Sequence, residues 1–119
     1  MVKVDWQDDI GTSVDHALVE KSLNLSLRRL NMVDNVKVEL MITDLTHIQK
    51  LNREHRAIDA PTDVLSFELP KNPENLLGSV VICQEIAAKQ AQEAKISLSD
   101  EISQLANHGL LHLLGYNHV

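Results

Sequence analysis

The sequence predicts an α/β (α+β) fold, a single domain in which helices pack on a small mixed β-sheet of about four strands. Three observations lead to this prediction. Segments with the alternation of strands are interleaved with segments of helical period, in the order β-α-β-α-β-β-α-α. The 119 residues suffice for one hydrophobic core, and 44% hydrophobic and 24% charged residues are ordinary for a globular protein. No repeat, low-complexity segment or linker divides the chain, so residues 1–119 are expected to form one domain.

Four segments are predicted to be strands because they are rich in β-branched residues or alternate between apolar and polar side chains. Residues 36–43 form the clearest one, and their continuously apolar second half is typical of a central strand. Residues 2–6, 64–69 and 76–83 are the others. Only a short, turn-rich connection separates the last two, which are therefore expected to form an antiparallel hairpin.

Four helices are predicted from the spacing of apolar residues and from the capping residues that precede them. Residues 53–63, which contain Asp59-Ala-Pro61, are expected to form a loop between the second helix and the third strand. The helices are expected from a Thr12 or Ser13 cap to about Leu30, from a Thr43 or Asp44 cap to about Asn52, from Glu85 to about Lys95, and from a Ser97 or Ser99 cap into the C-terminal segment.

Composition narrows the functional classes. A formal net charge of −6 argues against a broad, non-specific nucleic-acid binder, although it is compatible with a nuclease that has one local basic patch. Aromatic residues are scarce, which argues against a stacking platform for several bases. The single cysteine, Cys83, excludes an intramolecular disulfide and favours a reducing, cytoplasmic compartment. No apolar run approaches the roughly 20 residues that span a bilayer, so no membrane partner is expected.

The C-terminal stretch His108-Gly-Leu-Leu-His112-Leu-Leu-Gly115-Tyr-Asn-His118 predicts a metal site. His108 and His112 are four residues apart and lie on one face of a helix, about 40° apart around its axis. Gly115 is a residue at which a helix commonly ends, and His118 can then fold back toward the first two. Three nitrogen ligands with one open position are typical of a catalytic zinc site rather than a closed structural one.

The histidine helix differs from a zinc peptidase at one position. Its spacing matches the extended metzincin pattern, but Gly109 replaces the glutamate that serves as the general base. The missing carboxylate argues against a metalloprotease. A metal at this site can still lower the pKa of a bound water and polarise a bound oxygen.

A second polar stretch covers residues 51–67. Arg56 carries a planar, forked cation that suits a phosphate, and Asp59 and Thr62 can organise the loop around Pro61. The spacing is equally compatible with a well-capped loop that carries a solvated arginine.

These stretches also carry a family resemblance. The residues concerned are Leu51-Asn52…Arg56…Asp59-x-Pro61-Thr62-Asp63-Val64-Leu65-Ser66-Phe67, Leu77-Gly78-x-Val80-Val81-Ile82 and His108-Gly109-x-Leu111-His112-Leu113-x-Gly115-Tyr116-x-His118. From about Val36 to His118, the chain resembles the YbeY family of bacterial metal-dependent endoribonucleases.

The resemblance implies a single α/β domain that cuts single-stranded RNA in ribosomal RNA maturation, at the 3′ end of 16S rRNA, and in ribosome quality control. It implies one divalent ion, expected to be Zn²⁺, on His108, His112 and His118. It also implies that Arg56 faces the cleft and holds a phosphate or stabilises charge that develops on it. In the same motif we assign Ser66 to substrate binding.

Three departures from the family pattern affect these expectations. Ser79 and Asn117 stand where the family usually has aspartate, and both changes remove carboxylates expected near the site. The chain stops at Val119, where relatives usually continue into another helix. We therefore expect His118 to lie near a frayed end, which is also consistent with a truncated form.

The leading hypothesis is a metal-dependent endoribonuclease that acts on ribosomal RNA or ribosomal particles. The metal-bound hydroxide or the carboxylate of Asp63 is the candidate general base. The alternative is a non-catalytic ribosome-biogenesis factor whose metal only stabilises the C-terminal fold; a metalloprotease is the least favoured. The sequence does not indicate the metal in the cell, the RNA sequence cut or the oligomeric state.

Overall fold

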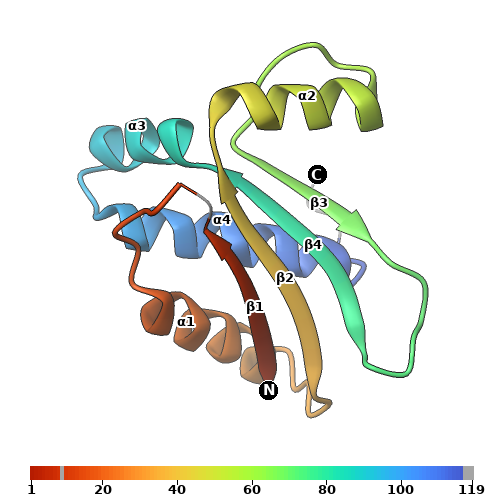
Figure 1. Ribbon diagram of the computed structural model, residues 1–119. Coiled ribbons are helices and arrows are strands. Elements are labelled where there is room, and N and C mark those ends of the chain that lie inside the picture. The colour runs from red at the N-terminus through yellow and green to blue at the C-terminus, as the bar shows by residue number, and fades with distance from the viewer. Residues whose placement is uncertain (9, 117–119) are drawn as a thin grey trace.

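A computed structural model describes residues 1–8 and 10–116 (Figure 1). This part of the chain has the predicted order of elements, and none of its helices is both long and apolar enough to cross a membrane. The elements are β1 (Val2–Asp8), α1 (His16–Arg29), β2 (Val36–Thr43), α2 (Leu45–Arg56), β3 (Val64–Glu68), β4 (Leu76–Cys83), α3 (Gln84–Ala94) and α4 (Leu98–Leu113).

The four strands form one mixed sheet with the order β1-β2-β4-β3. β2 pairs parallel with β1 on one side and with β4 on the other, whereas β3 pairs antiparallel with β4. The predicted mixed sheet, the hairpin and the central position of β2 are thereby confirmed. β3 is an edge strand, so one side of its main chain is not covered by another strand (Figure 1).

The larger part of the core lies between the sheet and the helices α1 and α4, which cover the same face (Figure 1). Alternation along β2 directs Val38, Leu40 and Ile42 to this face, where all three are essentially inaccessible to solvent. Each such side chain contributes roughly 1.5–3 kcal/mol on burial. α4 is therefore fixed on the sheet by apolar packing, and its opposite side remains available for a site.

A smaller apolar cluster lies on the other face of the sheet, under α2. It joins Ile48 of α2 to Leu65 of β3 and to Val81 and Cys83 of β4. β3 thus lies between α2 on one face and α4 on the other. This arrangement brings together two sequence motifs that are more than 40 residues apart.

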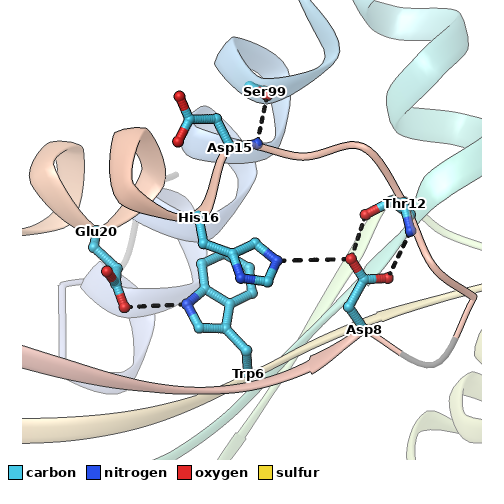
Figure 2. A network of polar contacts seen from close by, with 7 residues as sticks. All are labelled: Trp6, Asp8, Thr12, Asp15, His16, Glu20 and Ser99. Carbon is cyan, nitrogen blue, oxygen red and sulfur yellow. Dashed lines mark hydrogen bonds and ion pairs between the residues drawn. The ribbon is translucent and has the colours of Figure 1, made fainter.

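The start of α1 differs from the prediction. The helix begins at His16 and is capped by the carboxylate of Asp15, not by Thr12 or Ser13. Thr12 is occupied elsewhere, because its amide and hydroxyl both donate hydrogen bonds to the carboxylate of Asp8 (Figure 2). The capping oxygen therefore has to come from further along the chain.

The same network joins the beginning of α1 to β1 and α4 (Figure 2). The rings of His16 and Trp6 stack with their centroids 3.9 Å apart and their planes 5° from parallel. The indole N–H of Trp6 donates to Glu20, and the amide of Asp15 donates to the hydroxyl of Ser99. These contacts account for His16 and Trp6 without a functional site.

The end of α2 also differs from the prediction. The helix continues through Arg56 instead of ending near Asn52, and Ala57 terminates it in the left-handed conformation with φ 58°. Basic residues in its last turn interact favourably with the C-terminal end of the helix dipole. Arg56 therefore projects from the end of a helix and not from a loop.

Candidate active-site groove

A groove of about 730 Å³ follows the edge of β3, between the C-terminal end of α2 and the C-terminal half of α4. It contains Arg56 and Ser66 and two of the three predicted metal ligands. We call it the active-site groove, and it is lined by His55, Arg56, Val64, Leu65, Ser66, Phe67, Glu68, His108, Gly109 and His112.

α4 presents His108 and His112 to this groove because its opposite side is buried. Both histidines are exposed, whereas Ile102, Ala106 and Leu110 have 0–1% of their surface accessible. The prediction that both histidines lie on one face of a helix is thus confirmed, and the opposite face is the buried one. Ser97, one of the two predicted caps, begins the helix by accepting a hydrogen bond from the amide of Asp100. His108 and His112 lie one turn apart near the other end of the helix.

Glycine ends α4 as the sequence predicts. Gly115 has φ +90°, and its amide donates to the carbonyl of His112 while the amide of Tyr116 donates to that of Leu111. This pair of bonds is a Schellman motif, in which a left-handed glycine reverses the chain just beyond the helix.

Ser66 orients one of the predicted ligands. Its hydroxyl lies 2.7 Å from Nδ1 of His112 and comes from the neighbouring strand β3. When Nδ1 carries the proton, it donates to Ser66, and Nε2 keeps its lone pair for a metal. Ser66 therefore contacts a predicted metal ligand directly, a contact that the sequence did not predict.

The third predicted ligand, His118, and the substituted position Asn117 lie outside the described residues. Within residues 1–8 and 10–116, no group of three or more histidine, cysteine, aspartate or glutamate side chains is arranged to hold a metal ion. Two of the three predicted ligands can thus be compared with the prediction. Their nitrogen chemistry, helical spacing and shared groove fit a zinc-type ion.

Gly109 has a structural role as well as a chemical consequence. A Cβ atom at this position would lie 2.6 Å from Cγ1 and 2.8 Å from Cγ2 of Val80 in β4. The backbone of α4 therefore approaches the sheet more closely than any other residue type would allow. A glutamate here would begin in collision with the core, which strengthens the argument against a peptidase.

Arg56 lies in the groove with its side chain exposed. Among the described residues, no carboxylate is close enough to form an ion pair with it. Arg53, one turn earlier, instead pairs with Asp59 at 3.6 Å. The fork of Arg56 is consequently available for a phosphate in the groove.

Asp63 does not line the active-site groove. Its carboxylate accepts hydrogen bonds from the amide of Val64 at 2.8 Å and from the side chain of Gln90 at 3.2 Å. It faces a smaller adjoining pocket of about 330 Å³, which His108 and the buried Glu101 also line. Burial, followed by repulsion from Asp63, raises the pKa of Glu101 above its ordinary value.

Two other polar residues are accounted for by the fold. Ser79 donates to the carboxylate of Glu39 at 3.1 Å and does not line the groove. Cys83 is completely buried, and this burial raises the pKa of its thiol, so it has the properties of a packing residue and not of a nucleophile.

The groove also contains residues that sequence reasoning did not assign to the site, chiefly His55 and Phe67. Their rings contact each other with centroids 4.8 Å apart and a tilt of 59°. The sequence signal was the position of His55 beside Arg56. The edge position of β3, which opens Phe67 to the groove, depends on strand order and has no local signal.

Comparison with known proteins accords with this geometry. The family model described as Endoribonuclease YbeY matches residues 2–119. The chain belongs to the YbeY family. The YbeY endoribonuclease of Persephonella marina is 41% identical over 110 residues, which cover 89% of this chain and 71% of that protein. That of Aquifex aeolicus is 43% identical over 102 residues, which cover 84% and 67% of the two chains.

A solved structure supports the fold. The solution structure of TM1509 from Thermotoga maritima superposes with a TM-score of 0.61 at 28% identity, over 100% of this chain and 75% of that one. Membership of the YbeY family confirms the predicted resemblance and the α/β fold class.

Proposed function

We propose that the protein is a metal-dependent endoribonuclease that cuts single-stranded RNA in the active-site groove. The observation that carries this proposal is the meeting of Arg56, from α2, with His108 and His112, from α4, in one groove. Endoribonuclease is the activity in the names of the relatives reported above, and it requires a site that can hold a phosphodiester.

His108, His112 and His118 would hold the metal, which we propose to be Zn²⁺. The two described ligands support this part, because the 2.7 Å contact with Ser66 fixes the ring of His112 and directs Nε2 away from β3. A bound divalent ion would supply a Lewis acid for a phosphate oxygen and a water of lowered pKa.

Arg56 would bind the phosphate through its guanidinium fork. Such bidentate contacts hold the scissile bond in place and stabilise the charge that develops on the non-bridging oxygens. Ser66 would position both His112 and the substrate. Its hydroxyl can accept from His112 while its proton is donated toward the groove.

Asp63 is the candidate protein residue for accepting a proton. Its carboxylate lies in the adjoining pocket with His108 and is bonded to Val64 and Gln90. A role as base requires exchange of the Gln90 bond for one with the attacking water.

Ribosomal RNA, in particular the 3′ end of 16S rRNA, is the proposed substrate, and the cytoplasm is the proposed compartment. Ribosome quality control is the proposed cellular role, and residues 1–119 are taken as one catalytic domain. These assignments rest on the family resemblance.

The experiment is a cleavage assay on single-stranded RNA that contains the 3′ end of 16S rRNA, with the same sequence as a duplex for comparison. We expect His112→Ala and Arg56→Ala to lose most of the activity of the wild-type protein. Arg53→Ala is the matched control, because it removes a cation one turn earlier on the same helix, outside the groove. Equal cleavage by wild type and His112→Ala would refute the proposal.

A further inference from the structure

His55 and Phe67 form an aromatic pair at one side of the active-site groove. His55 is exposed at the end of α2, and Phe67 is half-buried in β3, where it also packs against the apolar cluster under α2. Their centroids are 4.8 Å apart, and both rings line the same groove as Arg56 and His112. An aromatic surface of two rings tilted 59° to each other thus lies beside the proposed phosphate site.

The edge of β3 adds hydrogen-bonding groups to this surface. The main-chain contacts of Asp63 with Cys83 and of Leu69 with Leu77 place the odd-numbered residues of this segment in hydrogen-bonded pairs with β4. The main-chain N–H and C=O groups of Ser66 and Glu68 consequently point away from β4, toward the open edge. Among the described residues, neither of these two amides has a hydrogen-bond acceptor.

We propose that His55 and Phe67 hold one unstacked nucleobase of the RNA strand, next to the phosphate bound by Arg56, and that the edge of β3 contacts the rim of that base. This inference rests on the proposed function and names how its substrate is recognised. Aromatic faces bind bases that are out of a helix, while main-chain donors and acceptors bind their hydrogen-bonding edges. In a duplex both faces of a base are stacked and its Watson–Crick edge is paired, so the His55–Phe67 pair also accounts for the proposed preference for single strands.

The composition and the fold limit this platform to one base. The chain has only three residues of the types Trp, Tyr and Phe. Trp6 is stacked on His16 in the network at the start of α1, and Tyr116 follows α4 and does not line the groove. A strand of RNA is therefore expected to make its base contact at one position and to be held elsewhere through its backbone.

The experiment uses the metal-loaded protein and a short single-stranded RNA that it cuts at a defined bond. An abasic ribonucleotide is placed in turn on each side of that bond, and kcat/KM is measured. For the wild type we expect a loss of roughly 5- to 150-fold at one of these positions, since stacking of one base on an aromatic side chain has an effect of this size. In His55→Ala and Phe67→Leu the intact RNA should be cut more slowly, and the abasic substitution should cause little further loss.

A second readout follows the base itself. 2-Aminopurine at the sensitive position should lose fluorescence when it binds the wild type and keep most of it with either variant. His16→Ala is the matched control, because it removes an imidazole from an aromatic stack away from the groove. His55→Ala guards against a folding artefact of Phe67→Leu, because His55 is exposed.

The possible failures are distinguishable. If abasic and intact RNA are cut equally, or if the losses from the variant and from the missing base multiply, the base platform is overturned while the nuclease assignment stands. If no RNA is cut, and an extended peptide binds the edge of β3 in its place, both the platform and the proposed function are overturned.

Discussion

Replacement of Gly109 by alanine tests how closely α4 must approach the sheet. The added carbon would lie 2.6 Å and 2.8 Å from the two methyl groups of Val80, whereas carbon atoms in contact prefer about 3.5–4.0 Å. Val80 is fully buried and β-branched, so its side chain cannot rotate away without a new collision. Overpacking of this kind costs about 1–3 kcal/mol, and the higher helix propensity of alanine offsets roughly 1 kcal/mol of that. We expect a net loss of up to about 2 kcal/mol in the free energy of unfolding.

The assay is urea unfolding of four proteins: wild type, Gly109→Ala, Val80→Ala and the double variant. Val80→Ala removes both methyl groups that the new Cβ would meet. In that background, Gly109→Ala should stabilise the protein through helix propensity, so its effect changes sign. A destabilisation of the same size in both backgrounds would refute the close contact between α4 and β4.

Three further predictions concern the groove. Ser66→Ala removes the hydrogen bond to His112 and should weaken metal binding by about 10- to 100-fold in calorimetric titration. Arg56→Lys keeps the charge but loses the fork, so kcat/KM on single-stranded RNA should fall by roughly 10-fold while stability is unchanged. Burial and the charge of Asp63 raise the pKa of Glu101 in the folded state. The stability contributed by its protonated form is therefore present below pH 4.5, its ordinary pKa, and is lost as the pH rises through the raised pKa. Relative to the wild type, Glu101→Gln should raise the free energy of unfolding more at pH 7 than at pH 4.

Matched controls separate these effects from general damage. Ser79→Ala removes a serine hydroxyl bonded to Glu39 outside the groove, and metal affinity should not change. Arg53→Lys changes the arginine one turn before Arg56, outside the groove, and should leave kcat/KM unchanged. If Ser79→Ala weakens metal binding as much as Ser66→Ala, the orienting role of Ser66 is wrong. A pH-independent difference between Glu101→Gln and wild type would contradict the burial of an ionised carboxylate.

Local patterns were sufficient for the elements of this fold and for one half of its site. Alternation in residues 36–43 predicted β2, and the four-residue spacing of His108 and His112 placed both on one face of α4. These features depend on neighbours within a few residues. The predicted end of α2 was wrong because Ala57, and not a residue near Asn52, ends the helix in a left-handed conformation that its residue type does not indicate.

The other half of the site depends on contacts between distant segments. The strand order β1-β2-β4-β3 places β3 at an edge of the sheet. Because β3 is at the edge, Ser66 and Phe67 can line the groove. Gly109 is a similar case. The sequence indicated the loss of a peptidase base, while the close approach to Val80 becomes visible only when α4 is packed on β4. Gly78 is another glycine whose role depends on a distant segment, since a Cβ there would lie 2.1 Å from the carbonyl oxygen of Phe67.

In the proposed function, histidines on α4 hold a metal that cuts RNA together with Arg56. The most direct test of this is elemental analysis of the purified wild type and of His112→Ala, with cleavage of one defined single-stranded RNA measured on the same samples. We expect the wild type to bind a divalent ion and cut the RNA, chelation to stop cleavage until the ion is restored, and His112→Ala to lose both the ion and the activity. Undiminished cleavage by His112→Ala, or by wild type freed of metal, would contradict it.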